Sequence, residues 1–134
     1  MTNEAYNQGI GRVGYLKEEV TLQDCCELVK QQFQLEGVKV FGELNQKVKR
    51  VAISPGSGKH MTELAIKKQA NVFITAEIDH HEGIDAVARG LSVIDAGHYG
   101  LEHIFVDAIA TFLSGTLETV EIEKEGIIHP FQFI

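Results

Sequence analysis

The chain has 134 residues, of which 44% are apolar, so it is long enough for one domain with its own core and too short for two independent domains. Its 12 basic and 19 acidic residues give a net charge of -7. This charge argues against nucleic acid as a partner, because phosphate binding needs cationic side chains, and it suits a bound cation. No apolar run approaches the roughly 18 residues that cross a bilayer, and the start MTNEAYNQGIG lacks a secretion signal, so we expect a cytoplasmic protein without membrane contact.

Residues 1–16 are polar and contain three glycines, a composition typical of a flexible lead-in or joint. The end of this segment, 12–16, is expected to be extended. Residues 17–134 are predicted to form a single α/β domain.

A helix is predicted to begin after Thr21, because the sequence TLQD places an acidic residue where it can complete a capping box with the threonine. Apolar residues at helical spacing follow, and the helix is expected to end before Gly37. Cys25 and Cys26 lie on this helix. Because neighbouring helical residues point about 100° apart, we interpret both cysteines as reduced packing residues, with a redox or metal pair as the alternative.

A strand is predicted at 38–41, and strands and helices alternate between residues 48 and 114. The predicted strands are 38–41, 48–54, 72–75 and 91–95, and the predicted helices are 59–70 and 81–89. Connections of this length imply right-handed crossovers between parallel strands. The predicted fold is therefore α/β, with a mostly parallel sheet and helices on both faces.

After Gly97 an apolar stripe of helical period predicts a long helix, which Ser114-Gly115 ends. The stripe consists of Leu101, Ile104, Phe105, Ala108, Ile109, Phe112 and Leu113. Further strands are predicted at 119–122 and 127–134, the second of them at a sheet edge or irregular because of Pro130.

In a parallel sheet, functional residues gather in the loops that follow the strands. The first such loop, SPGSGKH, matches a phosphate-binding loop only in part. The full pattern needs a glycine where this chain has Ile53 and a serine or threonine where it has His60, which argues against nucleotide triphosphatase chemistry. Two interpretations remain open: Gly56, Ser57 and Gly58 bind an anion through free backbone N–H groups, or the glycines only allow a tight turn.

The second loop, after the strand at 72–75, carries carboxylates and imidazoles within six residues. They are Glu77, Asp79, His80, His81 and Glu82. Nitrogen and carboxylate ligands together favour Zn, Mn or Fe over Mg or Ca, because the last two prefer oxygen ligands alone. A solvated helix start is the alternative for His80 and His81.

The third loop, IDAGHYGLE, offers a histidine and a glutamate. Gly97 permits a sharp exit from the strand, and His98 and Glu102 then lie one helical turn apart on the same side. They are predicted to be metal ligands, and a carboxylate near a helix N-terminus is also favoured by the helix dipole. The alternative is a capping histidine followed by an ordinary first-turn glutamate.

Three segments, VKRVAISPGSG (48–58), NVFITAEIDHHEGIDA (71–86) and IDAGHYGLE (94–102), resemble the GTP cyclohydrolase I type 2 homologue family, also called the Nif-three-like dinuclear metal centre proteins. The resemblance runs from GIGRVGYL at 9–16 to HPFQFI at 129–134. It implies one half of a two-fold-repeated α/β fold that surrounds a pair of metal ions in ring-like oligomers.

This resemblance implies that His98 and Glu102 are the metal ligands of this half, and that Glu77 and the histidine pair line the same cavity. Two departures stand out. The family's N-terminal half, with a His-His-Pro motif and an aspartate ligand, is absent, and the family's Thr-Gly-Asp is replaced by Thr-Ala-Glu at 75–77. The chain is therefore expected to be a fragment of a longer protein, or a short relative that completes its site across subunits.

Three functions follow as expectations. In the first, the intact protein is a dinuclear-metal-dependent hydrolase of cyclohydrolase type, in which Glu77 acts as acid or base and His80 or His81 orients an unidentified small-molecule substrate or a second metal. In the second, the chain is a non-enzymatic metal-binding or regulatory module that interacts with other proteins. In the third, it is a structural half that binds nothing alone. A half-domain should expose apolar surface, so we expect a homo-oligomer or a complex with the missing N-terminal half.

Overall fold

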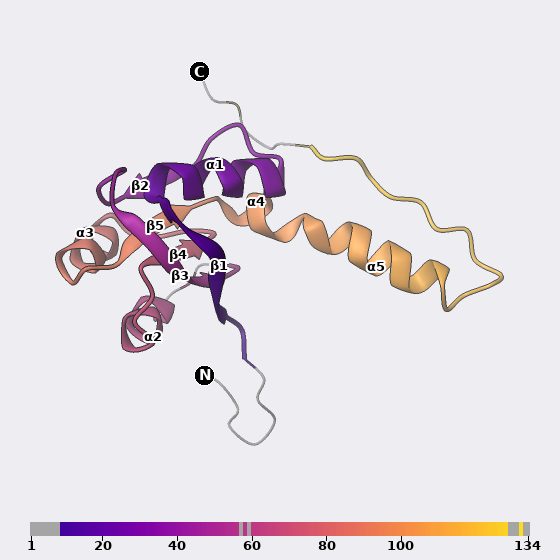
Figure 1. The fold of residues 1–134 in the computed structure, drawn as a ribbon. Helices are drawn as coiled ribbons and strands as arrows, with labels where there is room; N and C mark the ends of the chain where they lie inside the picture. Colours follow the sequence, from indigo (N-terminus) through magenta and orange to yellow (C-terminus); the bar gives the residue numbers. More distant parts are fainter. Residues whose placement is uncertain (1–8, 57, 59, 129–131, 133–134) are drawn as a thin grey trace.

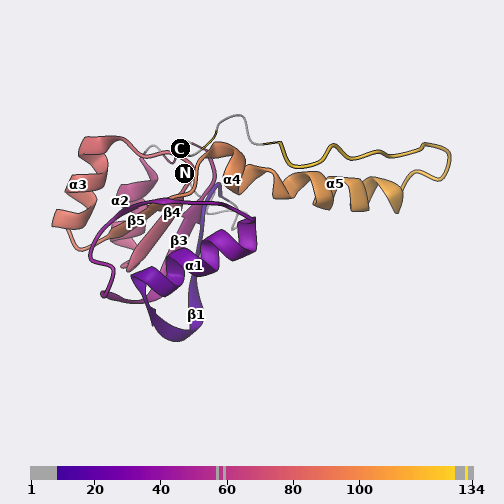
Figure 2. The same cartoon turned by 90° about the horizontal axis from the view of Figure 1, so that it is seen from above.

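Five strands form one sheet with helices on both of its faces (Figures 1 and 2). The computed structural model describes residues 9–56, 58, 60–128 and 132. The elements in chain order are β1 (Arg12–Thr21), α1 (Leu22–Phe33), β2 (Lys39–Phe41), β3 (Lys47–Ser54), α2 (Met61–Lys67), β4 (Val72–Thr75), α3 (His80–Ala88), β5 (Ser92–Asp95), α4 (His98–Glu102) and α5 (Ile104–Ser114). The strand order in the sheet is β1-β3-β4-β5-β2.

The three central strands, β3, β4 and β5, run parallel, and β1 and β2 pair with them as antiparallel edges. The predicted α/β class, with a parallel centre and helices on both faces, is confirmed. The segment 12–16 is extended, as expected, and forms the first half of β1. The sheet therefore begins inside the part of the chain whose composition indicated a lead-in.

The central strands alternate their side chains between two cores, because successive residues of a strand point to opposite faces. Val72 and Ile74 of β4 belong to the core beneath α1, whereas Phe73 between them packs with Ala65 of α2 and Ala86 of α3. All residues of β4 and β5 are buried, as is typical of parallel strands covered on both faces. The connections that follow these strands are thus held by a rigid support.

The predicted capping box is present at the start of α1. The Asp24 N–H donates to Thr21 Oγ1 over 3.1 Å, and the Thr21 N–H donates to Asp24 Oδ2 over 3.2 Å. Cys25 and Cys26 are unpaired and buried on the same helix, and burial raises the pKa of the Cys25 thiol to about 11. Such a thiol stays protonated at neutral pH, which supports a packing role for this residue.

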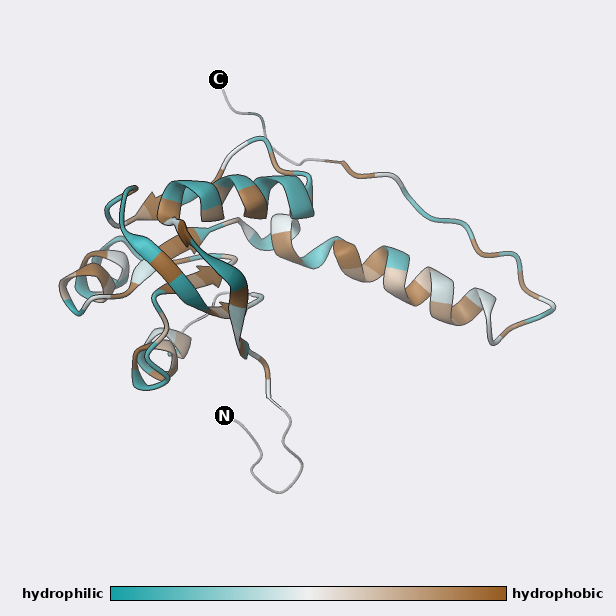
Figure 3. Cartoon of the chain, in the orientation of Figure 1, coloured by the Kyte–Doolittle hydropathy of each residue, from teal (hydrophilic) through white to brown (hydrophobic). Residues whose placement is uncertain are grey.

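The C-terminal part differs from the prediction. The apolar stripe forms helix, divided at His103 into α4 and α5, but α5 contains no buried residue and extends away from the sheet (Figures 1 and 3). The strands predicted at 119–122 and 127–134 are wrong as far as the structure describes them, because 119–128 form no strand. Residues 129–131 and 133–134 lie outside the described residues. The segment 119–128 lies away from the sheet, so no neighbouring strand supplies the backbone hydrogen bonds that a strand needs (Figure 2).

We call residues 104–128 the arm: α5 and the extended segment that runs back beside it. Lys124 Nζ lies 2.6 Å from Asp107 Oδ1 of α5, and the Ile128 N–H donates to Tyr99 Oη over 2.9 Å. Both contacts hold the returning segment against the helical part. In the described part of the chain no helix, α5 included, has the length and apolar character needed to span a bilayer.

Candidate functional site

Three loops meet at one edge of the sheet, as the parallel strands require. The register aligns Ser54 of β3 with Thr75 of β4, and Thr75 with Asp95 of β5, so the loops after these residues leave the sheet side by side. This edge, at the carboxyl ends of the strands, is where open α/β sheets bind their ligands.

His98 lies between two carboxylates at this edge. Gly97, with a φ of 74°, turns the chain out of β5 in a conformation that glycine adopts without strain, and His98 begins α4. His98 Nε2 is 2.9 Å from Glu77 Oε2, and His98 Nδ1 is 3.6 Å from Glu102 Oε1. The contact with Glu77 is short enough for a hydrogen bond. The contact with Glu102 is longer and is an ion pair when the ring is protonated. His98 and Glu102 thus lie together on one side of a helical turn, as their spacing predicted.

The two carboxylates raise the pKa of the His98 imidazole. The hydrogen bond to Glu77 is the main cause, and the charges of Glu102 and Glu77 act in the same direction, while partial burial opposes them. The three side chains are between 47% and 66% exposed, so water screens their interactions. The site is therefore an open one, in which the two carboxylates favour the protonated form of the imidazole.

We expect the Glu77→Gln variant to lower the pKa of His98, because the amide accepts a hydrogen bond without carrying a charge. An NMR titration of the His98 ring signals measures this pKa, and Glu118→Gln, which changes an exposed carboxylate of the arm, is the matched control. In wild type the folded-state pKa lies above the unfolded one, so this pair stabilises the fold below the unfolded pKa, and the stabilisation is lost as the pH rises through the folded pKa. A His98 pKa that is equal in wild type and Glu77→Gln would contradict the contact with Glu77.

Asp95 connects the second and third loops, a role that the sequence analysis missed. Its carboxylate is 9% exposed and accepts the N–H of Ile78 over 3.3 Å and that of Gly97 over 3.1 Å. Lys39 Nζ of the neighbouring strand lies 2.7 Å from the same carboxylate. Ile78 directly follows Glu77, and Gly97 directly precedes His98. The Asp95 carboxylate therefore sets the separation of the loops that carry Glu77 and His98. The signal that could have identified it is a carboxylate at the end of an otherwise buried strand, LSVID, since a buried charge needs partners.

The glycine-rich loop lies beside the third loop. A Cβ atom at Gly56 would be 3.7 Å from Glu102 Oε1, which brings the backbone of this loop next to that carboxylate. Gly58 has a φ of 54°, and a Cβ atom there would overlap with Thr75 Oγ1, so close packing alone accounts for this glycine. Ser57 lies outside the described residues. An anion site at Gly56, Ser57 and Gly58 stays a prediction, and the nearby glutamate would oppose it.

The acidic and histidine cluster of the second loop divides into two parts. Glu77 turns to His98, whereas the Asp79 side chain accepts the His81 N–H over 2.9 Å and caps α3. His80 and His81 are exposed with their ring centroids 5.4 Å apart, and within the described ranges no hydrogen bond or ion pair joins either of them to the pair on α4. A role of these two histidines toward substrate or a second metal stays a prediction.

The donor set has the chemistry of a transition-metal site but forms only part of one. His98 offers an imidazole and Glu77 and Glu102 offer carboxylates, a combination that suits Zn, Mn or Fe. Glu77 lies at Nε2 of the His98 ring and Glu102 lies at Nδ1. A metal ion bound to one of these nitrogens would therefore have only one of the two carboxylates beside it. In the part of the chain that the structure describes, no group of three His, Cys, Asp or Glu side chains converges on a metal position. A metal site at His98 and Glu102 therefore stays a prediction.

Comparisons with known proteins show the family to which this chain belongs. The family model for Duf34/NIF3 (NGG1p interacting factor 3) matches residues 2–129. A Staphylococcus aureus protein named GTP cyclohydrolase 1 type 2 homolog is 34% identical over 94% of this chain, and one of the same name from Halalkalibacterium halodurans is 32% identical over 100%. The chain spans only 36% and 37% of the length of these two relatives. Among solved structures, a Staphylococcus aureus protein is similar with a TM-score of 0.85 and 33% identity, covering 94% of this chain and 42% of that one. A Bacillus cereus protein related to NIF3 has a TM-score of 0.82 and 32% identity, covering 94% and 36%.

Proposed function

Because this chain belongs to the Duf34/NIF3 family, we propose that it supplies part of the metal site of a dinuclear-metal-dependent hydrolase. The observation that carries the proposal is the position of His98 between Glu77 and Glu102 at the carboxyl edge of the parallel strands. Imidazole and carboxylate side chains are the ligands that hydrolytic metal ions use. The edge is open, so a second polypeptide can add ligands to the two that the described residues offer.

In this proposal His98 and Glu102 hold one divalent ion, with Zn, Mn or Fe preferred over Mg or Ca. When bound, such an ion lowers the pKa of a water molecule enough to make hydroxide available at neutral pH. Glu77 lies beside His98 and would serve as the acid or base that accepts or donates a proton. His80 and His81, exposed at the start of α3, orient the substrate or bind a second ion.

The name of the relatives makes GTP the first substrate to test. The proposed location of the protein is the cytoplasm. The alternative function is a metal-binding or regulatory module without catalysis. It is favoured by the absence of a three-residue metal cluster among the described residues, since a two-ligand site binds metal weakly until a partner completes it.

Elemental analysis of protein purified without chelator, together with a hydrolysis assay on GTP and other nucleotides, separates the two functions. The hydrolase proposal expects bound Zn, Mn or Fe and turnover that a chelator abolishes and the same metal restores. Metal at full occupancy without turnover supports the binding module. Turnover that persists in metal-free protein would contradict both.

We also propose that the arm is a contact surface for a second copy of this chain or for the half that the longer relatives carry. Phe105 and Phe112 of α5 are 61% and 65% exposed, and further large apolar side chains of the arm are exposed as well. These are Ile104, Ile109, Leu117, Val120, Ile127 and Ile128. Figure 3 shows hydrophobic residues recurring along α5. Monomeric proteins rarely expose a continuous apolar surface of this kind.

A further inference from the structure

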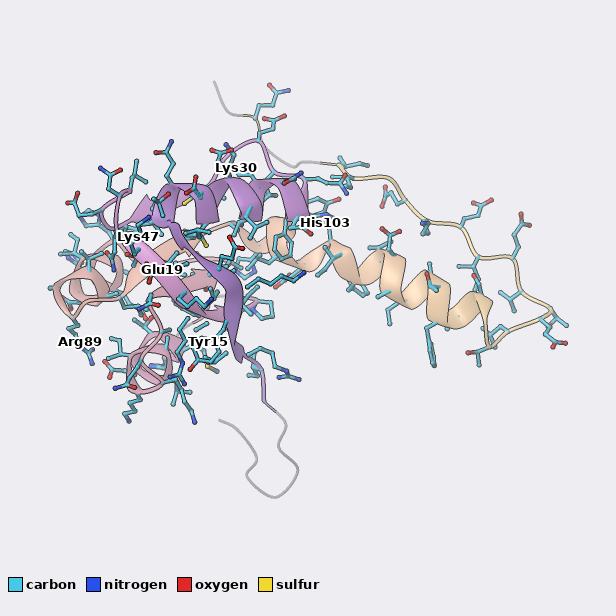
Figure 4. The ribbon with its side chains drawn as sticks, in the orientation of Figure 1. Tyr15, Glu19, Lys30, Lys47, Arg89 and His103 are labelled. Atoms are coloured by element: carbon cyan, nitrogen blue, oxygen red, sulfur yellow. The ribbon has the colours of Figure 1, made fainter. Side chains whose placement is uncertain are left out.

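A groove of about 360 Å³ lies between β1 and α2, on the face of the sheet that α2 and α3 cover. Its floor is apolar and consists of Ala52, Ala65 and Phe73, all of which are at least 96% buried. Val13 and Tyr15 of β1 form one wall, and Figure 4 shows Tyr15 on the part of β1 nearest α2. The groove shares no residue with the site around His98, and its volume lies in the range of small-molecule pockets.

Among the residues that the structure describes, three cations and no carboxylate line this groove. They are Arg12, Arg50 and Lys68, and none of them forms an ion pair with any residue that the structure describes. This concentration of positive charge stands out in a chain whose net charge is -7. Protein surfaces of one sign concentrate ligands of the opposite sign, and a concave, partly apolar wall strengthens that effect.

Arg50 is the cation best placed to recognise an anion. Its Nε atom is buried and has no hydrogen-bond partner among the described residues, and its guanidinium lies 5.3 Å from the centroid of the Tyr15 ring. The Nε atom has almost no exposed surface, so an anionic head group meets the other N–H groups of the guanidinium, where a carboxylate or phosphate oxygen accepts a charge-assisted hydrogen bond. The stacked ring holds the guanidinium in one orientation, so less freedom is lost when the anion binds.

We propose that this groove binds a small amphipathic anion, namely a chain or ring of about ten carbon atoms with one anionic head group. The apolar part lies on the floor formed by Ala52, Ala65 and Phe73, and the head group lies at Arg50, with Lys68 and Arg12 nearby. This binding is independent of the metal site, so its failure leaves the proposed hydrolase unaffected.

The fluorescent dye 8-anilinonaphthalene-1-sulfonate, a naphthyl group with one anionic substituent, is the probe for a binding titration. Decanoate is expected to displace the dye at least about tenfold more effectively than decanol, which has the same chain without the charge. The dissociation constant for the dye is expected to rise about tenfold in Arg50→Gln and several-fold in Lys68→Gln. Chemical shifts of the Ala52 and Ala65 methyl groups should change on addition of decanoate.

Lys67→Gln is the matched control, because Lys67 precedes Lys68 and does not line the groove. It removes the same charge and is expected to bind the dye as wild type does. Lys68 is exposed, so Lys68→Gln keeps the test valid even if Arg50→Gln does not fold. Equal dye affinity in wild type, Arg50→Gln and Lys68→Gln, or equal displacement by decanoate and decanol, would overturn the proposal.

Discussion

The His98→Ala variant is expected to lose metal affinity by at least about 100-fold relative to wild type, more than a change in a surrounding residue causes. The imidazole is the only nitrogen ligand at the open edge that the structure places within 4 Å of a carboxylate on each side. Its removal leaves the two glutamates without a common partner. Glu102→Gln is expected to weaken binding as well, because a neutral amide is a poorer ligand for a divalent ion.

Isothermal titration with Zn²⁺ or Mn²⁺ measures this loss. His60→Asn is the matched control for the histidine, because His60 has a φ of 70°, which asparagine tolerates, and it lies outside the His98 site. Glu118→Gln is the control for the glutamate. Since the His98 side chain is half exposed, His98→Ala should keep the wild-type circular dichroism spectrum. Wild-type affinity in His98→Ala would remove this residue from the metal site and with it the basis of the proposed hydrolase.

The double variant Phe105→Glu with Phe112→Glu is expected to turn an associated protein into a monomer of 14.8 kDa. Both rings are more than 60% exposed and lie two turns apart on α5, so a partner that covers the helix buries both. Burial of one such ring contributes about 1.5 to 3 kcal/mol, and a carboxylate at the same position makes the contact unfavourable. The loss of two rings, about 3 to 6 kcal/mol, therefore weakens the association by at least about 100-fold.

Multi-angle light scattering on wild type and variant gives the mass directly. Thr111→Glu adds a charge at an exposed polar position of the same helix and is expected to leave the assembly unchanged if the phenylalanine face is the contact. A wild-type chain that stays monomeric at high concentration would rule out self-association through the arm. Dissociation by Thr111→Glu alone would show that the added charge, and not the loss of the apolar face, controls the association of the chains.

The central sheet could be predicted from the sequence because its signals are local. A capping box at Thr21, glycines after helices and short apolar runs at 72–75 and 91–95 each specify an element within a few residues. The alternation of these elements then implies parallel strands, and parallel strands place the three loops at one edge. The proximity of His98 and Glu102 follows from the same local rule, since residues four apart on a helix share a side.

Features that depend on residues far away in the sequence could not be predicted from local sequence patterns. The alternating pattern at 119–122 indicated a strand, but a strand exists only where another strand accepts its hydrogen bonds, and this segment lies on the arm. The apolar stripe after Gly97 predicted a helix, but not whether another part of the protein covers its apolar face. The residues of α5 are not buried, because periodicity shows which face is apolar and not what covers it.

The sequence by itself determined the α/β class, the order of the central elements and the pairing of His98 with Glu102. The tertiary structure shows that, among the described residues, no hydrogen bond or ion pair joins His80 or His81 to His98. Only the tertiary structure decided that Glu77 is the hydrogen-bond partner of His98 and that Asp95 joins their loops. The physical reason is range: backbone propensity and helical spacing act over a few residues, whereas these contacts join positions about 20 residues apart through the packing of the whole sheet.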